Sequence, residues 1–194
     1  FDGKGYTISG LTSRGLFAYV GVGGTVQNVT VADSYISGNG VGAIAGQNYG
    51  GTIANCTVTD SVISGTQKHV GGIVGTNYGT VTRCINDGCT VYNEEPSSVG
   101  GIVGYNNDAG SDPAARNPVV SFCYNTGDVS TDYDSSERPV GGIVGENDGG
   151  LVTNCYNAGS VESTGDAVGG IVGYSNQGTI ENCHNVGSVV GDTY

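Results

Sequence analysis

Short runs of Val and Ile, separated by glycine, asparagine and aspartate, recur along the chain at a nearly constant interval. The hexapeptide VGGIVG, or its softer copy VGAIAG, begins at Val41, Val70, Val99, Val140 and Val168. Successive copies lie 28 or 29 residues apart, except for one interval of 41 residues. A degenerate first copy at 15–31 aligns without gaps on 42–58, so the chain contains six copies of one unit.

Each unit carries a second phrase downstream of the first. It reads GTIANCTV at 51–58, LVTNCYNAGSV at 151–161 and TIENCHNVGSV at 179–189. A unit therefore offers two or three short Val/Ile strands with Asn/Gly/Asp turns between them, and no room for a helix. Propellers and sandwiches need antiparallel pairs inside a unit, usually with longer strands. The pattern instead predicts an all-β fold, a single parallel β-solenoid (β-helix) whose coils stack on their own copies.

We expect residues 1–14 to form a lead-in strand that caps a six-repeat β-helix over 15–194. The repeats fall near 15–40, 41–69, 70–98, 99–139, 140–167 and 168–194. The fourth repeat is enlarged, mainly by the segment 108–118. Terminal coils need caps against edge pairing, and the degenerate first copy suits that role. Because the chain starts in mid-phrase, we also expect it to be a module whose partners include neighbouring domains of the same polypeptide.

Glycine fills half of each VGGIVG copy, although it weakens a strand interior. Stacking resolves this conflict, because each strand is hydrogen-bonded to the coils above and below it. The glycines then let the strand bend, take positive φ, or let backbones approach closely. One core column is formed by Phe17, Ile44, Ile73, Ile102, Ile143 and Ile171. Alternation puts the next residue, such as Val74, on the opposite face, so this strand is either covered on both sides or bent within the phrase.

A second column consists of cysteines. One repeat position, held by Val29 in the first copy, carries Cys56, Cys84, Cys123, Cys155 and Cys183. A position that accepts Val or Cys is small and apolar, which suits buried thiols. A left-handed residue at Asn182 could turn both Ile180 and Cys183 inward. Stacked coils lie ~4.8 Å apart, within reach of a disulfide, but we expect reduced packing thiols. Cys89 lies outside the column.

Composition narrows the choice of partners. Six Lys and Arg against 18 Asp and Glu give a net charge of −12, which argues against nucleic acids and anionic membranes. No apolar run approaches the ~18 residues of a membrane span, so we expect no membrane insertion. The chain has no CxxC pair, and His69 and His184 are isolated, so we expect no Cys/His metal site.

Two surface features carry candidate chemistry. Within 128–137, calcium ligands could come from Asp128, Asp132, Asp134 and Glu137. Their spacing is not that of an EF-hand, so we favour a solvated acidic loop over a calcium site. An aromatic strip is expected from Tyr124, Tyr156 and His184, which follow the column cysteine in three successive copies. Such a strip suits sugar rings, although ordinary column packing is the simpler explanation.

Catalytic motifs are missing from the sequence. It contains no GxSxG, HExxH or GxxxxGK[ST], and its many glycine-rich phrases recur with the repeat. We therefore expect no enzymatic activity and no cofactor other than the candidate calcium. A β-helix carbohydrate-active enzyme remains a weaker alternative, because a fold alone does not determine function.

The pairing of VGGIVGxN with NCYNxGxV resembles the Glug motif, a repeat of bacterial surface proteins that include adhesins and immunoglobulin A peptidases. The resemblance covers roughly 41–190, and the opening FDGKGYTISGL is similar to the lead-in that commonly precedes such arrays. It implies a right-handed β-helix in a secreted or cell-surface bacterial protein, acting as a stalk or spacer or in adhesion. Its partner would be a host or bacterial surface glycan or protein, and a glycan-binding face is the alternative function. The resemblance supplies no catalytic residues.

Overall fold

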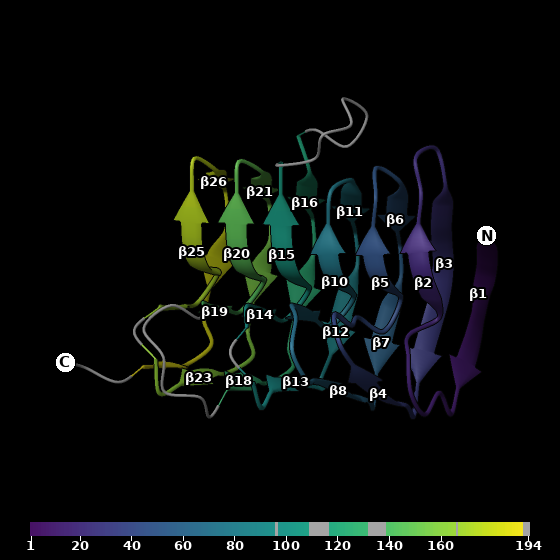
Figure 1. Cartoon of the computed structure of the whole chain (residues 1–194), viewed down its shortest axis with the longest axis horizontal. Coiled ribbons are helices and arrows are strands. Elements are labelled where there is room, and N and C mark those ends of the chain that lie inside the picture. Colours follow the sequence, from purple (N-terminus) through teal and green to yellow (C-terminus); the bar gives the residue numbers. More distant parts are fainter. Residues whose placement is uncertain (96, 109–116, 132–138, 166, 192–194) are drawn as a thin grey trace.

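The computed structural model describes residues 1–95, 97–108, 117–131, 139–165 and 167–191. All regular secondary structure in these ranges is β-strand. The strands pair in parallel and build four sheets that run along the molecule (Figure 1). The predicted all-β parallel solenoid of about six turns is therefore confirmed.

Sheet 1 lies at the front of Figure 1 and receives one strand from each coil. Its strands are β2 (Phe17–Val20), β5 (Ala45–Asn48), β10 (Val74–Asn77), β15 (Val103–Asn107), β20 (Val144–Asp148) and β25 (Val172–Asn176). The next strands of each coil cross behind it and form sheet 2.

Sheet 2 has two arms that share the long strand β3 (Thr25–Ala32). The first arm continues through β6 (Thr52–Ala54), β11 (Thr80–Thr82), β16 (Val119–Ser121), β21 (Leu151–Thr153) and β26 (Thr179–Glu181). The second arm continues through β7 (Thr57–Thr59), β12 (Ile85–Asp87), β17 (Tyr124–Asn125), β22 (Tyr156–Asn157) and β27 (His184–Asn185). The lead-in strand β1 (Asp2–Ser9) pairs with β3 at the N-terminal edge.

Two further sheets close each coil. Sheet 3 contains β4 (Tyr35–Gly38), β8 (Val62–Gly65), β13 (Thr90–Asn93), β18 (Val129–Thr131), β23 (Val161–Ser163) and β28 (Val189–Val190). Sheet 4 contains the two-residue strands β9 (Val70–Gly71), β14 (Val99–Gly100), β19 (Val140–Gly141) and β24 (Val168–Gly169).

The coils wind in a right-handed sense. In Figure 1 the strands of sheet 1 point upward in front, β3 and β7 point downward behind them, and the chain advances from right to left. The register follows the sequence repeat, so that Val103 pairs with Val74 on one side and Val144 on the other. The 41-residue interval adds no coil, because Val120 still pairs with Val81.

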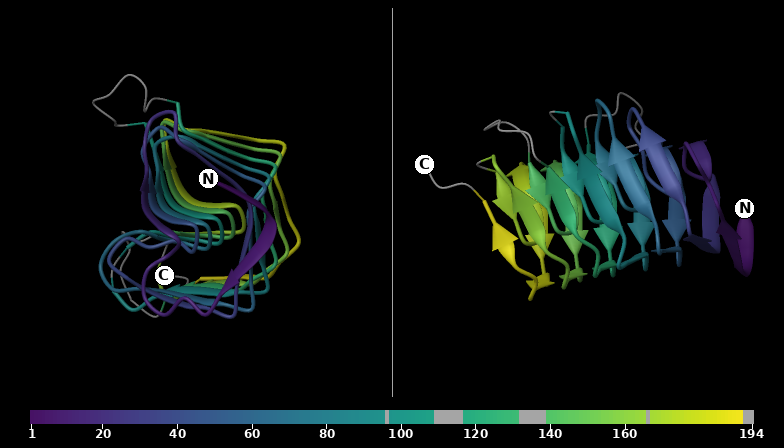
Figure 2. Two further views of the ribbon diagram at one scale, coloured as in Figure 1. Left: turned by 90° about the vertical axis from the view of Figure 1, so that its right-hand side faces the viewer. Right: turned by 90° about the horizontal axis from the view of Figure 1, so that it is seen from below.

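The VGGIVG phrase bends in the middle. Gly72 and Ile73 form the corner between β9 and β10, and the side chains of both Ile73 and Val74 are fully buried. The chain therefore runs toward the middle of the coil in sheet 4, turns at this corner, and runs outward again in sheet 1. This turn gives the coil the indented outline seen end-on in Figure 2. Of the two arrangements that the sequence left open, the structure has the bent strand.

Close backbone approach explains the glycines of this phrase. A Cβ on Gly71 would overlap the carbonyl oxygen of Val74, and one on Gly72 would overlap that of Gly101. None of the glycines in the four VGGIVG copies has a positive φ, so that part of the expectation is wrong. The corner is too tight for a side chain, and glycine is therefore required for space.

The turn between the two arms of sheet 2 has the predicted left-handed residue. Positive φ angles occur there at Asn28, Asn55, Arg83, Phe122, Asn154 and Asn182. At this turn the apolar residues on both sides point inward, as at Val152 and Cys155, which are 0% and 2% exposed. The inward column of Val, Ile and Cys is continuous along the solenoid as a result.

Within the described part of the chain, no helix is long and apolar enough to cross a membrane.

Candidate ligand-binding face

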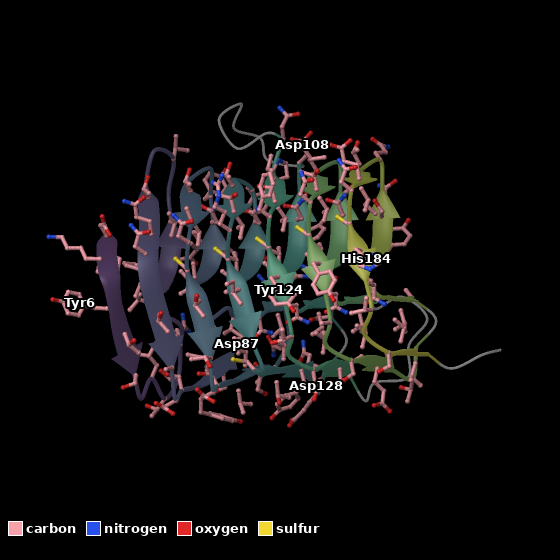
Figure 3. All side chains as sticks on the ribbon, turned by 180° about the vertical axis from the view of Figure 1, so that it is seen from behind. Tyr6, Asp87, Asp108, Tyr124, Asp128 and His184 are labelled. Carbon is pink, nitrogen blue, oxygen red and sulfur yellow. The ribbon has the colours of Figure 1, made fainter. Side chains whose placement is uncertain are left out.

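The aromatic strip lies on the outer surface of the second arm of sheet 2. Tyr124, Tyr156 and His184 occupy the first position of β17, β22 and β27 and pair in register. The ring centroids of the two tyrosines are 4.9 Å apart with an interplanar angle of 23°, and those of Tyr156 and His184 are 5.7 Å apart at 26°. Figure 3 shows Tyr124 and His184 along the same face. The column therefore presents mainly ring edges to solvent, because each ring covers the face of the next.

A strained corner flanks this column. Four of the six coils place Asn at the left-handed turn, but the third and fourth coils place Arg83 and Phe122 there. The Phe122 ring is 55% exposed, and the Arg83 guanidinium carbon lies 5.4 Å from its centroid. A bulky residue at positive φ is strained, and such strain collects at functional positions. The sequence analysis missed this pair, although its departure from Asn was a readable signal.

The cysteine column lies inside the solenoid behind these rings. Cys56, Cys84, Cys123 and Cys155 are buried, and Cys183 in the last coil is half-buried. Each thiol faces a backbone carbonyl; the Cys123 Sγ, for example, donates to the Ser121 oxygen at 3.3 Å. Burial raises the pKa of Cys123, and it raises the pKa of Cys89 to about 11. Protonated, buried thiols are poor nucleophiles and metal ligands, so Cys89 and Cys123 act through packing.

The candidate calcium ligands are only partly within the described residues. Asp128 precedes β18, and its carboxylate accepts a 2.5 Å hydrogen bond from the Ser160 hydroxyl. Asp132, Asp134 and Glu137 lie outside the described residues. In the described ranges no group of three or more His, Cys, Asp or Glu side chains could hold a metal ion. The calcium site therefore stays a prediction.

Two buried asparagine ladders hold the coils in register, and the sequence analysis missed both. In the first ladder, the Nδ2 of each asparagine donates to the Oδ1 of the asparagine in the next coil at 2.8 Å. The ladder runs through Asn48, Asn77, Asn106 and Asn147. All four side chains are fully buried. The same amides close the turn after sheet 1, as where Asn48 Oδ1 accepts from the Gly51 N–H at 3.1 Å.

The second ladder lies in the turn after the second arm of sheet 2. Asn86 donates to Asn125 at 2.7 Å, Asn125 to Asn157 at 2.8 Å, and Asn157 to Asn185 at 2.7 Å. The Oδ1 of Asn86 is buried without a donor, because the preceding coil has Val58 at this position. The recurrence of Asn two residues after the column cysteine was the signal for this ladder.

The fold and its surface define a repeat protein, a right-handed parallel β-solenoid with ladders of like residues. The family described as the GLUG motif matches residues 37–63, 140–162 and 164–190. Three of the repeats are therefore Glug motifs, as the sequence predicted.

A solved structure is similar to almost the whole chain. It is described as that of "a putative immunoglobulin A1 protease from Bacteroides ovatus", with 26% sequence identity and a TM-score of 0.71. The similarity covers 94% of this chain but only 58% of that one. No curated protein sequence matches the chain significantly.

Proposed function

We propose that this chain is a rigid, non-catalytic spacer module of a larger secreted or surface-attached bacterial protein. The observation that carries the proposal is the unbroken register of its ladders. Valine and asparagine positions pair coil after coil, and the register is kept across the enlarged fourth repeat. Six coils at ~4.8 Å give a rod about 30 Å long, which separates whatever is attached at its two ends.

The similarity to a Bacteroides ovatus protein and the Glug repeats support a bacterial surface setting. Glug is a repeat motif, which supports a non-catalytic role for the three repeats that match it. Incubation of the purified chain with immunoglobulin A1 tests the non-catalytic role, with a known immunoglobulin A1 protease as the positive control. We expect intact heavy chain on a denaturing gel. Cleavage that copurifies with the chain through two independent columns would overturn the proposal.

The spacer role also requires that the repeats are interchangeable units of the rod. Deleting one whole repeat, residues 70–98, joins two coils of the same register and should leave a folded rod one coil shorter. Small-angle X-ray scattering should then show a maximum dimension reduced by roughly 5 Å with an unchanged cross-section. Loss of cooperative folding in this variant would show that the repeats are not interchangeable units, contrary to the proposal.

A glycan-binding face is the second candidate function, and the Phe122 corner favours it. The half-exposed ring of Phe122, beside Tyr124 and Arg83, offers an apolar surface that stacking within the column does not use. A panel of immobilised bacterial and host glycans tests this role. Binding should weaken in Phe122→Asn, which also relieves the strained turn, so that lost binding cannot be blamed on lost folding. Equal binding by this variant would exclude the face.

A further inference from the structure

A separate cavity lies on the other side of the molecule, where the end of the lead-in segment and the first two coils meet beside sheet 1. Its volume is about 240 Å³. Its side chains come from Arg14, Phe17, Tyr19, Asn39, Gln47 and Lys68. Phe17 and Tyr19 belong to β2 and Gln47 to β5, while Lys68 lies just before β9. Sheet 1 faces the viewer in Figure 1, and Tyr124 and His184 of the aromatic strip are labelled in Figure 3, which views the molecule from behind.

The cavity concentrates positive charge in an acidic protein. Two of the six Lys and Arg residues of the chain line it, and no Asp or Glu does. Among the described residues, neither Arg14 nor Lys68 forms an ion pair or a side-chain hydrogen bond. An unpaired guanidinium and an unpaired ammonium at one cavity are suited to a carboxylate or another small anion.

The remaining lining residues are suited to a sugar ring. Tyr19 is 69% exposed and offers an aromatic surface, and Phe17 is held by an edge contact with Phe1 at 5.4 Å between centroids. Asn39 and Gln47 supply amide groups, and the Asn39 Nδ2 already donates to the Gln67 side chain at 2.9 Å. An aromatic surface with a few convergent polar groups is the usual composition of a small-molecule site. The volume is below the ~300–1,000 Å³ of drug-sized sites, so it suits a single sugar residue.

Glycines keep this cavity open. Gly40 has a φ of 69° and lies against Lys68, and a Cβ on Gly46 would lie 3.0 Å from the Ala18 carbonyl oxygen. A side chain at either position would be strained or crowded.

The same surface becomes acidic further along the solenoid. The position of Gln47 is held by Glu146 three coils later, through the register Gln47, Thr76, Tyr105 and Glu146. Glu146 accepts a hydrogen bond from Ser98 at 2.8 Å, and Asp148 accepts one from the Tyr105 hydroxyl at 3.3 Å. These two carboxylates make the later coils less favourable for an anion than the cavity of the first two coils.

We propose that this cavity binds one carboxylate-bearing sugar residue, a sialic or a uronic acid. Arg14 and Lys68 hold the carboxylate, and Tyr19 packs against the ring. The site goes beyond the spacer role and does not depend on it, because a spacer that binds an acidic glycan is still a spacer.

Isothermal titration of the chain with N-acetylneuraminic acid and with glucuronic acid tests the proposal and distinguishes the two sources of carboxylate. Glucose tests the contribution of the sugar ring without a carboxylate, and acetate tests the contribution of the carboxylate without a ring. We expect saturable binding of at least one acidic sugar, weaker binding of acetate and none of glucose. Arg14→Gln and Lys68→Gln should each weaken binding about tenfold, as loss of one charge-assisted contact does.

Lys4→Gln is the matched control, because it removes the same charge from the lead-in strand β1, outside the cavity lining. It should leave binding unchanged, and Tyr19→Ala should weaken acidic sugars more than acetate. Inorganic phosphate that binds as tightly as the sugars would reduce the cavity to a general anion site and overturn the proposal. Equal losses in Arg14→Gln and Lys4→Gln, or no binding by the folded chain, would also overturn it.

Discussion

At the scale of single residues, asparagine performs two different tasks in this fold. At the turn between the two arms of sheet 2 it adopts positive φ, as at Asn154 and Asn182, because its short side chain tolerates that conformation. Inside the turns it instead bridges coils through its amide, as at Asn125. The first task was predictable from the sequence, since the spacing of apolar residues demanded a left-handed turn. The second was not, because a repeated polar residue in a turn does not reveal that it is buried.

The amide ladder should be a major source of stability. In Asn125→Ala, the Asn86 Nδ2 loses its acceptor, the Asn157 Oδ1 loses its donor, and the Gly127 turn loses two hydrogen bonds. Leaving buried polar groups unpaired should lower the free energy of unfolding by roughly 2–4 kcal/mol. Urea denaturation followed by circular dichroism measures this free energy of unfolding. Asn176→Ala, which removes an exposed amide, is the control, and a similar loss in both variants would contradict the role of the ladder.

The cysteine column should contain free thiols. Because four of its members are buried, a thiol reagent should label native protein slowly and reach the half-buried Cys183 first. After denaturation without reductant, all six cysteines should react. Mass spectrometry counts the labels, and Cys183→Ala should remove the label that appears first in the native protein. Two or fewer reactive thiols in the denatured chain would instead establish a disulfide framework.

At the scale of the elements, the VGGIVG phrase shows where sequence reasoning reaches its limit. The repeat predicted that the strand stacks on its copies and that Ile73 is buried, and both are seen. Whether the strand bends depends on which backbone atoms meet across coils, and glycine frequency alone does not encode that. The glycines of the phrase and the asparagines beside them form one packing unit, since a Cβ on Gly101 would lie 2.5 Å from the Asn125 amide carbon.

A single methyl group at this corner should be costly. In Gly101→Ala the new Cβ would overlap the carbonyl oxygen of Gly142 in the next coil and press on Asn125 in its own coil. We expect a loss of about 3 kcal/mol or more in unfolding free energy, because neither backbone nor ladder can move freely. Gly21→Ala is the matched control: its Cβ would meet nothing within 4 Å, and its cost should stay within about 0.5 kcal/mol. Equal effects in thermal melts would refute close packing at the corner.

At the scale of the whole molecule, the repeat number and the register of the later coils follow from the sequence, but in the first coil Phe17 pairs with Ala45 and not with Ile44, the partner that the gapless alignment predicts. The stacked rings at Tyr124 and Tyr156 were predictable because identical repeat positions must lie one above another. The cavity lined by Arg14 and Lys68 was not, because its residues come from the end of the lead-in segment and from different repeat positions in the first two coils. Only the bend of sheet 4 against sheet 1 brings them together.

The edge of the last coil should make the 194-residue chain self-associate. The strands β25, β26 and β28 each pair on one side only, and Ile180 and Val190 there are 43% and 54% exposed. An unpaired, apolar strand edge is a template for another chain. Sedimentation velocity should therefore show a dimer that grows with protein concentration, and Val190→Lys should shift it to monomer by placing charge at that edge. Val22→Lys, at a side chain 55% exposed, adds the same charge elsewhere and should leave the dimer intact. A monomer at all concentrations, or equal dissociation by the two variants, would show that this edge is not the contact.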